Sequence, residues 1–200
     1  LFGVLGLVLA HNLSLMAATP TTSIPLGFVA PAFLLPDAVT GATMDSSDLF
    51  DGGPTVVVFM CNHCPFVIHV LEAFVAFAAE CRDRGVNVLA ISSNDVVNYP
   101  QDDVPRMKSL ALEHGFTFPY LYDETQDVAR AYDAACTPDF SVFDADRKCV
   151  YRGQFDGSRP GNDVPVTGED LRQVVDLLLE GKPVPGEGQR PSIGCNIKWR

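Results

Sequence analysis

The sequence is poor in positive charge. Its 200 residues contain 14 Lys and Arg against 25 Asp and Glu, which gives a formal net charge of −11 at pH 7. No cluster of basic residues offsets this balance. Nucleic acids and anionic membrane surfaces both require a positive footprint on the protein that binds them. The composition therefore argues against both as partners, and we expect no nucleic acid to bind.

Long apolar runs are missing as well. The apolar stretch LFGVLGLVLAHNLSL at residues 1–15 is shorter than the about 20 residues that cross a bilayer, so we expect no membrane span. Two interpretations of this stretch stay open. It is either the core of an export signal, with small residues near Ala17 and Ala18 for cleavage, or a segment upstream of a true start at Met16. The predicted location is accordingly periplasmic or cytoplasmic, without a decision between them.

Cysteines are too sparse for a scaffold that depends on disulfides. Six cysteines in 200 residues is far below the density of small secreted frameworks. The apolar content of 47% is instead sufficient for one domain with a sizeable core. We expect an N-terminal extension at residues 1–26, one domain at 27–181, and a Pro/Gly-rich tail at 182–200 that lies over the surface.

The periodicity of apolar residues predicts strands that alternate with helices. Residues 27–51, rich in Pro, Gly, Asp and Ser, predict a loose hairpin ahead of the main fold. Strands are expected at 55–60, 86–92, 118–123, 139–144 and 148–153, and helices at 65–84, 104–114, 124–134 and 169–180. The last pair of strands is separated only by ADR, which fits an antiparallel hairpin. This order of elements predicts an α/β sandwich with a mixed sheet.

The strongest functional signal is the stretch VVVFMCNHCPF, where Cys61 and Cys64 separate a buried strand from a helix. Such a junction lies at the carboxyl edge of the sheet, where α/β folds place their sites. Unpaired amides and the helix dipole favour a thiolate there, and they lower a cysteine pKa from about 8.5 to about 3.5–7.5. We therefore expect Cys61 to act as a nucleophile and Cys64 to close the disulfide ring.

His63 lies between the two cysteines. As a cation it would stabilise the Cys61 thiolate, which makes the reduced form more stable and the disulfide a stronger oxidant. A redox-tuning role is therefore one interpretation of His63. A solvated loop histidine without such a role is the other.

A metal site is the main rival to redox chemistry at these sulfurs. Zinc sites usually carry a second CxxC or a pair of histidines. Neither is present, because His69 and His114 stand alone in the sequence, and we expect no metal and no cofactor. A copper(I) site made of Cys61, Cys64 and one further soft ligand is an alternative that residue types leave open.

A Thr137-Pro138 step just before the predicted hairpin completes a pattern of strand, CxxC and helix that resembles thioredoxin-like proteins. In that superfamily the proline is cis and faces the CxxC disulfide, and the backbone before it pairs with substrate. The resemblance implies a thioredoxin-like three-layer sandwich with a central mixed β-sheet at residues 27–181. It also implies that Cys61 attacks, that Cys64 resolves, and that Thr137 and Pro138 bind the substrate.

More narrowly, several motifs resemble a bacterial subgroup of peroxiredoxin-like proteins grouped with alkyl hydroperoxide reductase and thiol-specific antioxidant domains. These motifs are CNHCPF, SSND, ACTPDF, YRGQFD, PVTG and PSIGCNIKW, and the resemblance covers residues 18–200. It implies a thiol-disulfide oxidoreductase with a role in redox homeostasis, or a thiol peroxidase. The implied partners are a disulfide-containing protein or small thiol substrate and an electron donor of unknown identity.

The sequence departs from the peroxiredoxin pattern where peroxide is held. When the CP motifs are aligned, Cys64 takes the peroxidatic position and Cys61 takes the place of a threonine, while Val57 and Pro138 replace a proline and an arginine. Because peroxide activation depends on donors aimed at the developing oxyanion, these replacements argue against an efficient peroxidase. This sequence also lacks the buried aspartate of the thioredoxin pattern, because Thr55 takes its place. Asp95 is a candidate to accept the proton of Cys64 instead.

The remaining cysteines differ in how close they are expected to be to the site. Cys136 lies two residues before Pro138 and is a candidate additional thiol, or else a small buried apolar residue. Cys195 lies in the tail and could fold back as a remote redox partner. Cys81 falls on the apolar stripe of its helix and Cys149 in a hairpin strand, so both are expected to serve packing.

Overall fold

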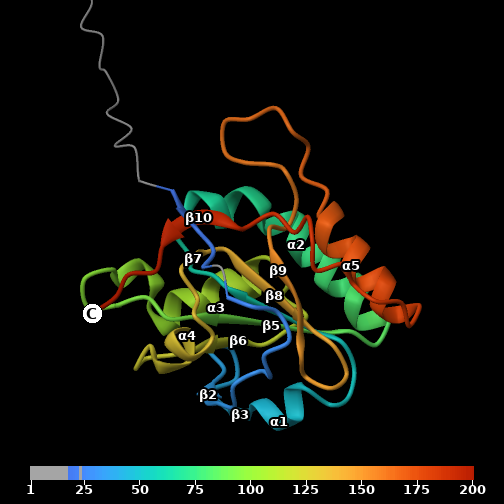
Figure 1. The fold of residues 1–200 in the computed structure, drawn as a ribbon. Coiled ribbons are helices and arrows are strands. Elements are labelled where there is room, and N and C mark those ends of the chain that lie inside the picture. Colours follow the sequence, from blue (N-terminus) through green and yellow to red (C-terminus); the bar gives the residue numbers. More distant parts are fainter. Residues whose placement is uncertain (1–17, 23) are drawn as a thin grey trace, which may run out of the picture.

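The computed structural model describes residues 18–22 and 24–200 (Figure 1). The predicted export signal or upstream segment at residues 1–17 lies outside these residues. A central sheet of five strands has the order β6-β5-β4-β8-β9. Helices and a hairpin cover its two faces, so the predicted thioredoxin-like sandwich with a mixed sheet is confirmed.

The central sheet contains parallel and antiparallel pairs. Its strands are β4 (Thr55–Phe59), β5 (Asn87–Ser92), β6 (Tyr120–Tyr122), β8 (Asp139–Phe143) and β9 (Cys149–Gly153). β5 pairs in parallel with β4 and β6, whereas β8 pairs antiparallel with β4 and β9. Every residue of β4 is buried, as its uninterrupted apolar run predicts for a strand covered on both faces.

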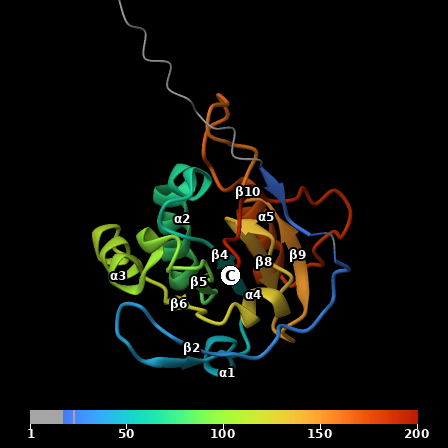
Figure 2. The ribbon, with the colours of Figure 1, turned by 90° about the vertical axis from the view of Figure 1, so that its left-hand side faces the viewer.

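One face of the sheet is covered by the three longest helices, α2 (Pro65–Asp83), α3 (Val104–Glu113) and α5 (Glu169–Leu179). The other face is covered by α4 (Asp127–Ala131), α1 (Ser46–Leu49) and the hairpin of β2 (Leu34–Pro36) and β3 (Thr43–Asp45). Figures 1 and 2 show α2 and α5 above the sheet and the hairpin with α1 below it. A short 3-10 helix, η1 (Pro100–Asp102), precedes α3.

Helix α2 carries the second half of the predicted thiol motif. It begins at Pro65, where a missing N–H costs nothing because early helical amides lack partners. Its predicted apolar stripe is buried as expected and includes Cys81. The helix ends before Gly85, whose φ of +74° lies in the left-handed region that favours glycine.

Helix α4 is shorter than the sequence predicts. The helix was expected to begin at residue 124, but it begins at Asp127 because Gln126 adopts a left-handed φ of 67°. The Asp123 carboxylate accepts a hydrogen bond from the Ala129 amide at 2.9 Å. Asp123 thus satisfies an amide in the first turn of α4.

The end of the predicted surface tail is instead a buried part of the fold. Strand β10 (Ile193–Asn196) pairs antiparallel with β1 (Thr19–Pro20) and with β7 (Cys136–Thr137), and the three form a second sheet. Cys195 and Ile197 are 3% and 1% exposed. The expectation of a surface tail was wrong for residues 192–198, because their alternating pattern lets them pair with the backbone just before Pro138.

Candidate redox site

The two cysteines of the CxxC motif lie where β4 gives way to α2. Cys61 follows the last residues of the strand, and Cys64 is the N-cap of α2. Both side chains are buried, with exposed fractions of 1% and 0%, and both are free thiols. The predicted junction of strand, dithiol and helix is therefore present. Below, "the dithiol" denotes Cys61 and Cys64.

The loop before β8 faces the dithiol. The Thr137-Pro138 peptide bond is cis, as the resemblance implied. The Thr137 hydroxyl lies 3.6 Å from the Cys61 sulfur, and the Cys64 thiol donates to the Thr137 carbonyl at 3.0 Å. Segments far apart in the sequence thus meet at the sulfurs, and Thr137 contacts both of them.

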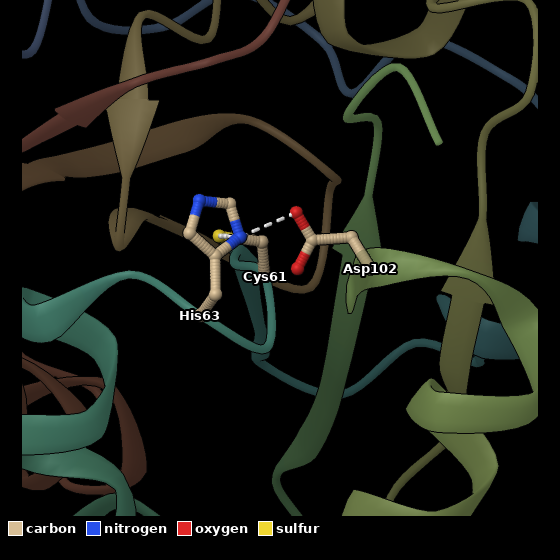
Figure 3. Close-up of side chains that lie close together, drawn as sticks. All are labelled: Cys61, His63 and Asp102. Carbon is tan, nitrogen blue, oxygen red and sulfur yellow. Dashed lines mark hydrogen bonds and ion pairs between the residues drawn. The ribbon is translucent and has the colours of Figure 1, made fainter. Parts of the chain in front are cut away.

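His63 and a buried carboxylate lie on the other side of Cys61 (Figure 3). The His63 Nδ1 atom is 2.7 Å from Asp102 Oδ2 and 4.0 Å from the Cys61 sulfur. The histidine side chain is 22% exposed and that of Asp102 is 0% exposed. When Nδ1–H donates to Asp102, this nitrogen has no lone pair with which to accept the Cys61 proton. In this arrangement Nδ1 does not serve as a proton relay for Cys61.

Asp102 is a residue of the site that sequence reasoning missed. Its carboxylate accepts hydrogen bonds from the Asn62 amide at 2.9 Å and the Asn94 side chain at 2.8 Å. Burial disfavours its charge, but the hydrogen bonds from His63, Asn94 and Asn62 outweigh burial and hold the pKa of Asp102 below its ordinary value. The sequence signal was the Asp pair in PQDD, of which only Asp103 is used to cap α3.

Asp95, the candidate proton acceptor, is directed elsewhere. Its carboxylate accepts hydrogen bonds from the Asn98 side chain and the Val97 amide, and it lies 3.7 Å from the Arg200 guanidinium. These bonds hold the pKa of Asp95 below its ordinary value. The buried carboxylate that does lie beside Cys61 is that of Asp102, which has an oxygen within 4.8 Å of the Cys61 sulfur.

The hydrogen bond within the dithiol separates the two pKa values. The bond from the Cys61 thiol lowers the pKa of Cys64 to about 5 against the opposing effect of burial. The same bond, followed by burial and the Asp102 charge, raises the pKa of Cys61 well above its ordinary value. These directions are the reverse of the expectation that Cys61 carries the lowered pKa. Because α2 begins at Pro65, it is Cys64 that lies at the helix N-cap, where unpaired amides and the dipole favour an anion.

The two candidate additional thiols lie on opposite faces of the small sheet. Cys195 is the register partner of Thr137, and directly opposed residues of an antiparallel pair share one face. Burial, followed by the neighbouring Cys64, raises the pKa of Cys195 to about 12. Cys136 is paired with Asn196 and its thiol donates to the Pro138 carbonyl at 3.6 Å. Cys195 therefore adjoins the dithiol, whereas Cys136 faces the other way.

Two further features bear on what the site could bind. Among the described residues, one group of metal-ligand side chains has its donor atoms within 4.8 Å of one another, namely Cys61, His63 and Asp102. None of the helices in the described part of the chain is long and apolar enough to cross a membrane.

The fold and the site together define a thioredoxin-like protein with a CxxC dithiol beside a cis-proline. Residues 26–152 match the AhpC/TSA family, and the chain belongs to this family. Membership supports a thiol redox role. A comparison with curated proteins found no match.

Solved structures include two that are similar over nearly the whole chain. An uncharacterised conserved protein from Geobacillus kaustophilus is 54% identical, with a TM-score of 0.90 and coverage of 92% of this chain and 97% of that chain. A hypothetical protein from Sinorhizobium meliloti is 47% identical, with a TM-score of 0.88 and coverage of 91% and 98%. A secreted disulfide oxidoreductase from Mycobacterium tuberculosis is 21% identical, with a TM-score of 0.56 and coverage of 73% and 96%, which is a likeness of fold.

Proposed function

We propose that this protein is a thiol-disulfide oxidoreductase whose redox couple is Cys61 and Cys64. The observation that carries the proposal is the pair of buried, mutually hydrogen-bonded thiols that both contact Thr137. A CxxC disulfide closes almost no loop and so constrains the unfolded chain very little. Electron exchange therefore explains this pair better than a structural bridge does.

The proposed reaction begins with the proton shared by the dithiol. The directions of the two pKa values place the charge of the singly deprotonated pair on Cys64, which in that form no longer donates to the Thr137 carbonyl. Transfer of the Cys61 proton to Cys64 restores that bond and places the charge on Cys61, to which the Thr137 hydroxyl donates. The Cys61 thiolate then attacks one sulfur of the substrate disulfide, and the other sulfur leaves as a thiolate.

The second half of the reaction releases the reduced substrate as one thiol and one thiolate. Cys64 gives its proton to the departing thiolate and attacks the Cys61 sulfur of the mixed disulfide. The Cys61–Cys64 disulfide forms and the second substrate sulfur leaves, so the substrate gains two electrons and the protein loses two. In this scheme Thr137 and Pro138 shape the edge against which the substrate lies.

His63 and Asp102 would set the potential of the couple. A positive charge on His63, 4.0 Å from the Cys61 sulfur, stabilises the thiolate and hence the reduced form. Asp102 holds the imidazole in place through its bond to Nδ1. The substrate would be a disulfide-containing protein or a small thiol compound, and a separate electron donor would restore the dithiol.

Insulin reduction by the purified protein with a dithiol reductant tests the proposal. We expect Cys61→Ser and Cys64→Ser to abolish turnover, because each variant retains only one sulfur of the couple. Cys149→Ser is the matched control, since Cys149 is also 1% exposed but lies in the core cluster on the opposite face of the sheet. Full turnover by Cys61→Ser would remove the assignment.

Thiol peroxidase is the second candidate function, and one observation favours it. Cys64 occupies the N-cap of α2 with a pKa lowered to about 5, which suits a peroxide-reactive thiolate. In a Cys61→Ser background this function requires hydrogen peroxide to convert Cys64 to a sulfenic acid much faster than it oxidises a free thiol. Oxidation at the free-thiol rate, measured with a sulfenic-acid probe, would exclude it.

A copper(I)-binding module is less well supported by the ligand geometry. Among the described residues, the sulfurs of Cys61, Cys64 and Cys195 do not all lie within 4.8 Å of one another. The group that does, Cys61, His63 and Asp102, offers one sulfur, whereas copper(I) prefers soft sulfur ligands. Titration of the reduced protein with copper(I) decides the matter. A stoichiometric thiolate-to-copper absorption band that Cys61→Ser removes would establish the metal site.

A further inference from the structure

The Cys64 sulfur has two thiol neighbours and not one. Beside it lie the thiol of Cys61, its partner in the CxxC motif, and the thiol of Cys195 from β10, whose register partner Thr137 accepts the Cys64 thiol. All three side chains are nearly excluded from solvent, with exposed fractions of 1% for Cys61, 0% for Cys64 and 3% for Cys195. Cys64 therefore has two candidate disulfide partners, Cys61 and Cys195.

The backbone fixes Cys195 in this position. Cys195 is in register with Thr137, whose carbonyl accepts the Cys64 thiol at 3.0 Å, so β7 aligns both cysteines. The neighbouring Gly194 lies so close to β7 that a Cβ atom there would be 2.0 Å from the Thr137 carbonyl oxygen. Only glycine fits this approach, and the side chain of residue 195 is consequently brought up to the site.

Both ends of β10 are anchored as well. Before the strand, the Ser192 hydroxyl donates to the Gly153 carbonyl at 2.5 Å. After it, the Lys198 amide donates to the Asn94 side chain at 2.9 Å, and the Gln126 side chain donates to the Lys198 carbonyl at 2.8 Å. A strand held at both ends and along its length keeps the Cys195 sulfur in a defined place.

We propose that Cys195 is a third redox-active thiol, which exchanges with the Cys61–Cys64 disulfide to form a Cys64–Cys195 disulfide. This inference rests on the proposed redox role of the dithiol. The Cys195 sulfur attacks Cys64, the bond between Cys61 and Cys64 breaks, and Cys61 leaves and takes up the proton of Cys195. One disulfide replaces another, so no external oxidant or reductant is consumed.

The exchange has a consequence for the oxidised protein. With the disulfide between Cys64 and Cys195, β10 is covalently tied to the start of α2 and Cys61 is again a free thiol. The oxidised state is thus divided between one form in which Cys61 is blocked and another in which it is free.

Oxidation of Cys61→Ser with glutathione disulfide tests the proposal. Cys64 attacks glutathione disulfide, which forms a mixed disulfide and releases glutathione, and Cys195 then displaces the second glutathione. We expect mass spectrometry of unreduced chymotryptic digests, in which cleavage after Phe59 and Phe66 separates Cys64 from Cys81, to show the peptide with Cys64 linked to the peptide with Cys195, and no glutathione on the protein. A persistent glutathione adduct, or a Cys195 that remains available for alkylation after denaturation, overturns the proposal.

Two double variants test whether Cys195, and not another cysteine, displaces the glutathione from Cys64. In Cys61→Ser/Cys195→Ser the glutathione adduct on Cys64 should persist, whereas Cys61→Ser/Cys136→Ser should form the linked peptides normally, because Cys136 faces away from Cys64. Oxidised wild-type protein should contain linked Cys64 and Cys195 peptides as a fraction of the total, and their absence also contradicts the exchange. Insulin reduction by Cys195→Ser distinguishes the two proposals, because the Cys61–Cys64 couple should retain turnover without this thiol.

Discussion

Among single residues, Cys64 is the centre of the site. Its sulfur adjoins the Cys61 thiol, the Cys195 thiol and the Thr137 carbonyl, and the residue is the N-cap of α2, although its side chain makes no capping hydrogen bond. The hydrogen bond from Cys61 is the largest cause of its lowered pKa. The acidity of the site is therefore a property of the sulfur pair and should change when either sulfur is replaced.

Replacing Cys61 by serine or by alanine separates the hydrogen bond from the sulfur. Cys61→Ser keeps a donor at this position, so the pKa of Cys64 should remain near 5, whereas Cys61→Ala should move it toward the ordinary 9.0. The thiolate absorbance of each variant, followed against pH, measures the difference. Equal pKa values in the two variants would show that the hydrogen bond is not the cause.

Asp102→Asn tests the buried carboxylate through the pH dependence of stability. A carboxylate whose folded pKa is depressed stabilises the fold above its unfolded pKa, and this contribution is lost as pH falls through the lower folded value. The variant should be about 1–3 kcal/mol less stable than wild type at neutral pH. Urea unfolding should show this gap shrinking below about pH 4, and a gap that is constant with pH would contradict the assignment.

Sequence patterns predicted some of these residues and missed another. Cys61 and Cys64 stand out because the change from strand to helix is local, and Thr137 and Pro138 followed from the resemblance. Asp102 was missed because it lies 40 residues from Asn62, the residue whose amide it binds, and nothing local marks a carboxylate as buried.

Among the elements, β10 had the least predictable place. Helices α2 and α5 were predicted nearly to the residue, because an apolar stripe and a terminal glycine are local signals. Strand β10 has four residues and follows a Pro/Gly-rich stretch, and its partners β1 and β7 have two residues each. Pairing of such short strands depends on the assembled fold, and composition alone therefore suggested a tail.

Gly194→Ala should loosen β10. A methyl group there would overlap the Thr137 carbonyl, and we expect a loss of about 1–3 kcal/mol in the free energy of unfolding. Alkylation of Cys64 and Cys195 by iodoacetamide should become faster as the strand moves away. Gly186→Ala is the control, because its Cβ would meet only the Leu26 side chain at 3.6 Å. Unchanged alkylation in Gly194→Ala would mean that β10 does not cover the thiols.

In the whole molecule, stability depends on two apolar clusters on either side of the sheet. The cluster below α2 is built around Phe74, which is 2% exposed. Its ring packs against four other aromatic rings with centroids 5.4 to 6.2 Å away, those of Phe77, Phe118, Phe140 and Phe155. The position of the dithiol at the start of α2 depends on this packing.

Phe74→Ala should therefore destabilise the whole fold. Removal of a buried phenylalanine typically costs about 3–5 kcal/mol, including the cavity that remains. Ile68→Ala on the same helix is the control, because Ile68 is 56% exposed and such substitutions usually change stability by about 0.5 kcal/mol or less. Denaturant unfolding of both variants measures the difference, and similar midpoints would show that the cluster is not the core.

The central claim concerns the redox couple, and its reduction potential tests it most directly. Cys195→Ser protein, in which only the CxxC exchange remains, is equilibrated in glutathione buffers, quenched with acid and analysed by mass. We predict one reversible two-electron transition to a Cys61–Cys64 disulfide, at a potential between about −270 mV, typical of a reductant, and about −120 mV, typical of an oxidant. Two thiols that remain reduced in the most oxidising buffer, or that acquire only glutathione, would contradict the account.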